Sequence, residues 1–557
     1  MSNKTVSKSK NDKKITIYNA DTIDEMKLRI EDIKSEAQKR VQQKESSDWP
    51  EKRRIIEIIR QFIKRNRRPV NGGTALQEIA LYKDPSLAIY DVDGEPADID
   101  FYSPRPILDV ISLSNEFHKA GFSDIYAFEA LHSETYTIRV KGWRCCDVSY
   151  MESKIYDQVC HCGLLINGYK VTHPHFMIID YYRAMNDPMQ SYFRLEKVFS
   201  RFTLLQKLSP FQIPSSSLNF DIGNDDLPIL TSFILMPLLK EFAHQNNNIV
   251  IIGEISTAFY LSLKKETIKS ASKYEKSDLF LDKLNITKIK DSYYPIKSKS
   301  KTKTKKNTKN KDKNDENILS LDYPDRTIKD NVLKPTFYPL PIFEFVSENF
   351  KKHCQQIWSI LSSMSFGSNR LTYSEYRPFF DFTGRRGEFY LGNRCIVRIL
   401  DHRERCVPFK KFKLTKELEL NMATFPVTIM FSLMMRFQNG IFQSYKNKEE
   451  GKKVQDKYDL NINELYQSRN TFLKANNKSI FDETPFQEFV LDCIGCVTPL
   501  QTHKDDVIKW KKKHGKSTGH FKYEPTKPTS AFDNEQYCNT SGNIIKNPKD
   551  QWFIPRS

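Results

Sequence analysis

The sequence contains no apolar run long enough to cross a bilayer, and its first residues carry no apolar signal core. Cysteine is also scarce, with 10 residues spread along 557. Two groups have partial zinc-ligand spacing without forming a complete motif: Cys160-His161-Cys162 with His173 and His175, and Cys493 with Cys496. These absences predict an intracellular protein in a reducing compartment, with free thiols and no membrane partner.

Positive charge, by contrast, is abundant. The formal net charge is +18, from 87 lysines and arginines against 69 acidic residues. An excess of this size favours a polyanionic partner such as nucleic acid, because binding it releases counterions. About half of the excess is local, since residues 297–313 hold nine lysines and one aspartate. The rest of the chain is still basic, so the preference for a polyanion does not depend on that segment alone.

Two aspartates separated by one residue, Asp98 and Asp100, are the clearest indication of chemistry. In a strand, residues i and i+2 point to the same face, so both carboxylates would project together while Ile99 and Phe101 face the core. Adjacent carboxylates repel each other, and a hard divalent cation such as Mg²⁺ is the usual reason for them to coexist. The pair alone also fits a polar strand edge, so the surrounding residues must distinguish a metal site from such an edge.

Those surrounding residues predict a nucleotide-transfer site. Upstream, the sequence Asn71-Gly72-Gly73-Thr74 predicts a turn that opens a helix, where the backbone can approach a phosphate closely. Downstream, Asp147 lies in a later predicted strand and supplies a third carboxylate. A glycine pair at a helix start, followed by carboxylates on two strands of one compact unit, indicates metal-dependent transfer of a nucleotide.

A basic helix precedes the glycine pair. Apolar residues at helical spacing predict a helix over residues 51–66. Its other face fits either a solvated surface or a contact with a phosphate backbone. The candidates for RNA binding are Arg60, Lys64, Arg67 and Arg68.

Four stretches resemble the catalytic subunits of poly(A) polymerases from large cytoplasmic DNA viruses, in the nucleotidyltransferase superfamily built on the polymerase-beta palm-like fold. They are residues 71–76, residues 97–101, the strand that ends in Cys146-Asp147-Val148, and the helical segment 191–198. The resemblance covers most of residues 50–500, and its specific motifs lie between about 70 and 200. One departure is the gap from Gly73 to Asp98, which is longer than in most of the superfamily.

The resemblance implies template-independent transfer of AMP from ATP to an RNA 3′-hydroxyl with two Mg²⁺ or Mn²⁺ ions. In that scheme Asp98 and Asp100 bind both ions, and Asp147 binds the ion that activates the hydroxyl. An exposed helix face is the alternative interpretation of the basic residues that follow. The residues implied in nucleotide binding are Gly72, Gly73, Thr74, Arg194 and Lys197, with Arg201 on the same helix face.

The implied partners are ATP and the RNA 3′ end, with a homodimer or a processivity subunit as further options. The implied location is the host cytoplasm, in the viral factory, and the virion. Two competing interpretations remain open. A CCA-adding or uridylyl-adding transferase would use the same carboxylates, and a non-catalytic RNA-binding subunit would keep the fold alone. The residues that contact adenine cannot be identified from the sequence.

The predicted fold is mixed α/β (α+β), with a polymerase-beta-like catalytic domain and a degenerate second copy. Residues 249–259 echo residues 70–76, and residues 394–401 echo the strand around Asp147. No Asp-x-Asp strand accompanies the second copy, which predicts that it is catalytically silent. The predicted divisions are a disordered tail (1–14), a helical region (15–69), the catalytic domain (70–210), the degenerate domain (211–500) with a Lys-rich insert (297–313), and a polar tail (501–557).

Overall fold

The fold is taken from a computed structural model, which describes residues 20–45, 49–90, 96–130, 134–213, 234–235, 237–263, 327–329, 342–364, 371–392, 394–402, 405–415, 418–444, 446–495, 509, 513 and 521–527. The predicted tail at 1–14, the Lys-rich insert at 297–313 and most of the predicted tail at 501–557 lie outside these residues.

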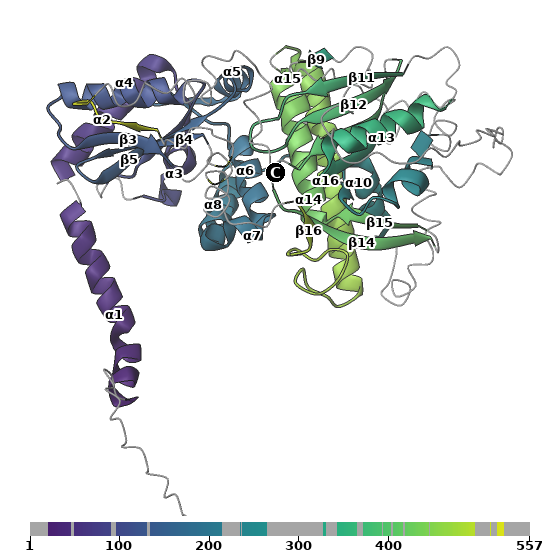
Figure 1. The fold of residues 1–557 in the computed structure, drawn as a ribbon, viewed down its shortest axis with the longest axis horizontal. Coiled ribbons are helices and arrows are strands. Elements are labelled where there is room, and N and C mark those ends of the chain that lie inside the picture. The colour runs from purple at the N-terminus through teal and green to yellow at the C-terminus, as the bar shows by residue number, and fades with distance from the viewer. Residues whose placement is uncertain are drawn as a thin grey trace, which may run out of the picture.

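Two helices begin the described chain, as predicted: α1 (Ala20–Glu45) and α2 (Trp49–Asn66). Figure 1 shows α1 extending away from the rest of the molecule. In α2, apolar residues such as Ile55, Ile59 and Phe62 recur at helical spacing and are buried. This apolar side packs against α4 (Pro106–Lys119), so α2 is anchored to the first sheet while its basic side remains available.

Within the described residues, the first sheet has eight strands in the order β17-β3-β4-β5-β2-β1-β7-β6. Its strands are β1 (Val70–Asn71), β2 (Ile99–Ser103), β3 (Ile125–Glu129), β4 (Thr135–Val140), β5 (Trp143–Tyr150), β6 (Leu164–Ile166), β7 (Tyr169–Val171) and β17 (Lys522–Tyr523). The helices of this half are α3 (Gly72–Lys83), η1 (Pro85–Leu87), α4, α5 (Ser153–Cys162), α6 (Pro174–Met185), α7 (Pro188–Ser191), η2 (Tyr192–Arg194) and α8 (Leu195–Leu208).

The central strands of this sheet bring the predicted motifs together. Strand β1 runs antiparallel to β2, with Asn71 opposite Asp100. Strand β2 runs parallel to β5, with Asp100 opposite Asp147. The glycine turn and two of the carboxylates therefore lie on neighbouring strands, as the motif order predicts. Asp98 differs slightly from the prediction, because β2 begins at Ile99 and Asp98 lies immediately before it.

The second sheet has nine strands in the part of the chain that is described, in the order β16-β14-β15-β8-β10-β13-β12-β11-β9. They are β8 (Ile249–Ile251), β9 (Thr327–Lys329), β10 (Phe343–Ser347), β11 (Leu371–Tyr376), β12 (Arg386–Leu391), β13 (Arg394–Asp401), β14 (Val407–Thr415), β15 (Leu418–Ala423) and β16 (Cys493–Ile494). The helices of this half are η4 (Leu238–Ala243), α10 (Gly253–Ser262), α13 (Phe350–Ser362), α14 (Phe425–Met435), η7 (Arg436–Ile441), α15 (Phe442–Ser444) and α16 (Lys448–Ala475).

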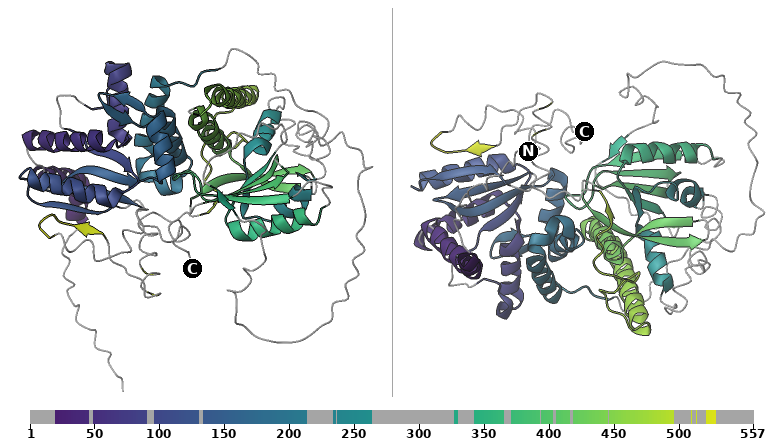
Figure 2. Two further views of the ribbon diagram at one scale, coloured as in Figure 1. Left: turned by 90° about the horizontal axis from the view of Figure 1, so that it is seen from above. Right: turned by 60° about the horizontal axis from the view of Figure 1, so that its bottom comes forward.

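The two halves pack side by side and share one buried apolar cluster. Helix α6 contacts α14, and Arg436 of η7 lies 3.0 Å from Nδ1 of His175 in α6. Figure 2 shows that β17, from the far end of the chain, lies beside the first sheet. There Lys522 pairs with Phe128 of β3, so the C-terminal segment completes the edge of the N-terminal sheet.

The expectation that every cysteine is a free thiol was wrong for one pair. Cys406 and Cys493 form a disulfide, although 87 positions separate them. They meet because β14 and β16 are antiparallel neighbours, with Pro408 opposite Cys493. Sequence spacing cannot reveal a pairing made by tertiary structure. The other cysteines among the described residues are free, namely Cys145, Cys146, Cys160, Cys162, Cys354 and Cys395. No helix within the described ranges is long and apolar enough to span a membrane.

Candidate active site

A cleft of about 580 Å³ opens where the central strands of the first sheet meet α6 and α8. A concave site with a few convergent polar groups is the usual form of a binding pocket. The structure places all three predicted carboxylates in its lining, together with Gly72, Arg194 and Lys197. The residues with predicted catalytic roles are thus gathered in one place, although 49 positions separate Asp98 from Asp147.

The three carboxylates differ in their partners. Asp147 is held by Arg144, whose Nε lies 3.0 Å from Oδ1, and it accepts a hydrogen bond of 2.7 Å from the Thr137 hydroxyl. Asp100 is different, because its Oδ1 is buried and has no hydrogen-bond partner among the described residues. A buried polar atom without a partner is costly. Asp100 is therefore the carboxylate that most needs a ligand.

Burial and neighbouring charge both act on this cluster. Burial, followed by repulsion from Asp98 and then Asp147, raises the pKa of Asp100 to about 8. Burial and the charge of Asp147 also raise the pKa of Asp98. Arg144 and Arg201 oppose these shifts without cancelling them. When these carboxyl groups are ionised together they repel one another, and a divalent cation would offset that negative charge.

This charge predicts a pH-dependent effect of Mg²⁺ on stability. Because the pKa of Asp100 is raised on folding, its protonated form stabilises the folded state below its usual pKa of 3.8, and this stabilisation is lost as the pH rises through about 8. We expect Mg²⁺ to raise the melting temperature more above pH 8 than at about pH 6, measured by scanning fluorimetry. The variant Asp100→Asn should lose the difference, whereas equal shifts at both pH values would contradict the prediction.

The donor set fits a divalent cation, but the ligands are not yet assembled. In the part of the chain that the structure describes, no three His, Cys, Asp or Glu side chains converge closely enough to hold a metal ion. Both oxygens of Asp147 are bonded, to Arg144 and Thr137. Asp98 and the partnerless Asp100 supply the hard oxygen donors that Mg²⁺ prefers. Asp147 would join them once Arg144 releases it.

The glycine turn lies directly against the carboxylates. Gly72 begins α3 with a φ of +66°, a conformation that side chains with a Cβ rarely adopt. A Cβ at Gly72 would lie 2.6 Å from Oδ2 of Asp100. A Cβ at Gly73 would lie 2.7 Å from Nη2 of Arg201 and would collide with the hydroxyl of Tyr90. Side chains of the site therefore approach both glycines so closely that a Cβ at either position would displace a neighbour.

Thr74 makes a hydrogen bond to the backbone next to the carboxylates. Its hydroxyl donates a hydrogen bond of 2.6 Å to the backbone carbonyl of Asp98. Thr74 therefore links the start of α3 to the residue that precedes β2. This contact positions Asp98 beside the glycine turn.

Three cations face the carboxylates from η2 and α8. Arg194, Lys197 and Arg201 all line the cleft. Arg201 donates a hydrogen bond of 3.0 Å to the Tyr90 hydroxyl. Burial lowers the pKa of Arg194, although the charge of Asp180 opposes the shift. Its Nε is buried and has no hydrogen-bond partner among the described residues, so an anion in the cleft could accept from it.

The four residues predicted to bind RNA have different surroundings. Lys64 and Arg67 line a groove of about 700 Å³ beside α5 and β7. Arg60 lies 3.9 Å from Glu78, at the limit of an ion pair, and its side chain is 43% exposed. Arg68 makes a two-point ion pair with Asp109, at 2.6 and 2.9 Å, and is only 12% exposed. The guanidinium of Arg68 therefore joins the connection between α2 and β1 to α4.

Several residues of the cleft were missed by the motif search. Phe193 lines its rim and is 59% exposed, and Asp180 and Arg183 of α6 line its floor. The second half contributes a further wall. Phe380 and Asp381 lie between β11 and β12, and Arg405 lies between β13 and β14. No local pattern marks these residues, because only the packing of the two halves brings them to the cleft. The basic segment 191–198 is the one signal that could have identified Phe193.

Comparisons with known proteins agree with this geometry. One family model, poly(A) polymerase catalytic subunit, matches residues 57–191. A second, for the C-terminal part of the mimivirus poly(A) polymerase catalytic subunit, matches residues 299–554. Together the two ranges cover more than half of the chain.

Individual relatives extend the match along the chain. A protein of Acanthamoeba polyphaga mimivirus, named as a poly(A) polymerase catalytic subunit, is 27% identical over 556 residues, which is 97% of this chain and 85% of that protein. A protein of the same designation from African swine fever virus is 28% identical over 179 residues, 31% of this chain and 37% of its own length. The crystal structure of the Megavirus polyadenylate synthase is 25% identical, with a TM-score of 0.67 and coverage of 98% of this chain and 96% of that one.

Proposed function

Because this chain belongs to the poly(A) polymerase catalytic subunits of large DNA viruses, we propose that it adds AMP from ATP to the 3′ end of RNA. It is then a polynucleotide adenylyltransferase that needs no template. The observation that carries this proposal is the cleft in which three carboxylates face three cations. Such a site can bind a triphosphate and catalyse displacement at its α-phosphorus: the RNA 3′-oxygen forms a new P–O bond, and pyrophosphate leaves.

Divalent cations are used generally in this family, and here two Mg²⁺ or Mn²⁺ ions are proposed. When bound, they would stabilise the attacking and the leaving oxygen of the displacement. Asp98 and Asp100 would hold both ions, and Asp147 would hold the one next to the RNA hydroxyl. The partnerless Oδ1 of Asp100 supports this assignment. Arg144 would keep Asp147 in place until the ligands assemble.

The triphosphate would lie between the start of α3 and the basic wall. Backbone N–H groups of Gly72 and Gly73 are at the positive end of the helix, where phosphate groups bind well. Arg194, Lys197 and Arg201 would neutralise the phosphate oxygens from the opposite side. Thr74 would act on the site indirectly, by holding the backbone of Asp98.

The base and the RNA would use different surfaces. Phe193 is an exposed aromatic ring at the rim, and such rings stack on nucleotide bases. Lys64 and Arg67, with Arg60 nearby, would contact the RNA phosphates in the groove beside α5. Arg68 lines the same groove, where its guanidinium also forms an ion pair with Asp109. A homodimer or processivity subunit, and a location in the host cytoplasm and virion, are further proposals from the family.

The test is a primer-extension assay in which each of the four NTPs is offered separately with Mg²⁺ and a short RNA. We expect long products with ATP and little extension with the other three. Preference for UTP, or limited addition of CTP followed by ATP, would instead identify a uridylyl-adding or CCA-adding transferase. Absence of extension with every NTP, while the chain still binds the RNA, would indicate a non-catalytic RNA-binding subunit.

A further inference from the structure

The second sheet repeats the strand pairing of the catalytic site with different side chains. Asp100 pairs with Asp147 on the neighbouring parallel strand of the first sheet. At the corresponding positions of the second sheet, Glu344 of β10 pairs with Arg398 of β13, which also run parallel. Two residues before Glu344 the chain has Ile342, so the strand has a single carboxylate. Arg398 therefore stands where the catalytic half has a metal-ligating aspartate.

The glycine turn is repeated as well. Gly253 begins α10 with a φ of +68°, close to the +66° of Gly72 at the start of α3. A Cβ on Gly253 would collide with the carboxylate of Glu344, just as one on Gly72 would contact Asp100. The carboxylate of Glu344 thus occupies the same place relative to its turn as that of Asp100. The second half has retained the backbone arrangement of the catalytic site and one of its three carboxylates.

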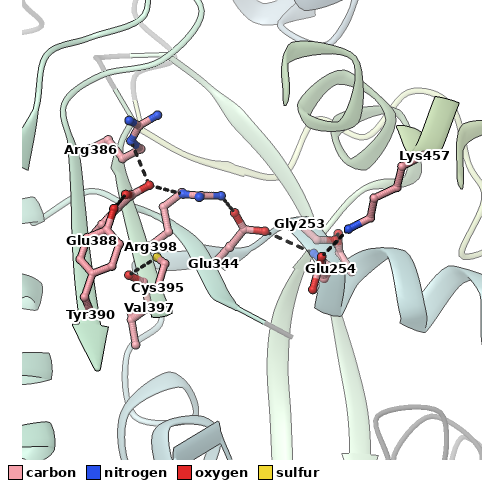
Figure 3. A network of polar contacts seen from close by, with 11 residues as sticks. Gly253, Glu254, Glu344, Arg386, Glu388, Tyr390, Cys395, Val397, Arg398 and Lys457 are labelled. Carbon is pink, nitrogen blue, oxygen red and sulfur yellow. Dashed lines mark hydrogen bonds and ion pairs between the residues drawn. The ribbon is translucent and has the colours of Figure 1, made fainter. Parts of the chain in front are cut away.

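Arg398 supplies a positive charge at this place. Figure 3 shows its guanidinium between Glu344 and Glu388. It forms an ion pair with Glu344, and its Nε lies 2.6 Å from Oε1 of Glu388. The exposed fractions of Arg398, Glu344 and Glu388 are 7%, 6% and 1%. Glu388 takes the register position that Thr137 has in the catalytic half.

The remaining charges of this network are also compensated. Arg386 lies 3.2 Å from Glu388, and Lys457 of α16 lies 3.5 Å from Glu254. The Glu254 N–H donates to Oε2 of Glu344 at 3.4 Å, so both oxygens of Glu344 have partners. Burial alone would raise the pKa of Glu388, but Arg386 and Arg398 outweigh it and lower the pKa to about 2.

We propose that the guanidinium of Arg398 is a built-in replacement for a divalent cation, and that the second half contains a latent cation site that an aspartate at this position would restore. The ligand would be a hard divalent ion such as Mn²⁺ or Mg²⁺, bound by oxygens of Glu344, Glu388 and the new carboxylate. The proposal concerns the second half alone and does not depend on the function proposed for the catalytic cleft. It also explains why this half needs no ion to bury its carboxylates.

The test uses the full chain in a background of Asp98→Asn, Asp100→Asn and Asp147→Asn, which removes the ligands of the catalytic cleft. In this background we expect no binding of Mn²⁺. The melting temperature should stay the same with and without the ion, and the electron paramagnetic resonance signal of free Mn²⁺ should not decrease when protein is added. Adding Arg398→Asp should lower the melting temperature without metal, because buried carboxylates then repel. Mn²⁺ should restore it and bind saturably, as one ion per chain.

Two further variants complete the design. Adding Glu344→Gln to Arg398→Asp should weaken Mn²⁺ binding by roughly tenfold or more, since a ligand is lost. The double change Glu388→Thr and Arg398→Asp copies the Thr137–Asp147 pair and has one carboxylate fewer, so it should fold more readily. The proposal is overturned if neither Arg398→Asp chain binds Mn²⁺, if neither folds with Mn²⁺ present, or if the background binds Mn²⁺ equally well.

Discussion

Replacing Asp98 and Asp100 together by asparagine should abolish Mg²⁺-dependent extension of an RNA primer. Asparagine keeps the size of each side chain but removes the charge that would hold the ions. We expect the extension rate to fall by roughly a thousandfold or more, the scale on which loss of a preorganised electrostatic group slows an enzyme. Quenched-flow or gel-based primer extension with ATP would measure it.

Binding of the RNA should survive this change, because the proposed RNA contacts lie in the groove beside α5. A matched control is Asp124→Asn, which alters an exposed aspartate of the same half outside the cleft. Asparagine tolerates the left-handed conformation that Asp124 adopts, with a φ of 50°. Undiminished extension by the double variant would show that the catalytic carboxylates have been assigned wrongly.

Changing Gly72 to alanine should lower the extension rate about a hundredfold, because a misplacement of about 1 Å in a reacting group costs about that much. The new Cβ would lie 2.6 Å from Oδ2 of Asp100 and would force that carboxylate out of position. Single-turnover extension at saturating ATP would separate this loss from weaker nucleotide binding. The φ of +66° adds a cost to stability of about 1–2 kcal/mol.

The control for backbone strain is Gly121→Ala. Gly121 has a φ of +90°, and nothing lies within 4 Å of the position its Cβ would take. It should therefore show a comparable loss of stability in thermal unfolding with the extension rate preserved. If both variants lost activity equally, the effect at Gly72 would reflect strain in general and not contact with Asp100.

The sequence predicts the parts of this site that depend on local spacing. Asp98 and Asp100, two residues apart, and the Gly72-Gly73 pair at a helix start can be recognised without knowing the rest of the fold. The register that sets Asp100 beside Asp147 then follows from parallel pairing of their strands. The spacing within each motif is encoded by residues that are neighbours in the chain, whereas the register joins two separate strands.

What could not be predicted depends on contacts between distant segments. Asp381 and Arg405 reach the catalytic cleft only because the second half packs against the first. The disulfide between Cys406 and Cys493 requires two strands 87 positions apart to become neighbours. The missing Asp-x-Asp pattern predicts that the second half is catalytically silent. The guanidinium of Arg398 between two glutamates becomes visible only in three dimensions.

Strand β17 bears on how the protein is made. It pairs with β3, and Tyr523 donates a hydrogen bond of 2.6 Å to Asn115, 408 positions earlier. The ring of Phe521 also packs on the ring of Tyr136, with 5.4 Å between the ring centroids. During synthesis the edge of β3 therefore stays without this partner strand until residues several hundred positions later have left the ribosome. Until then, this edge is open to pairing with other chains, so the nascent protein depends on rapid completion or on chaperones.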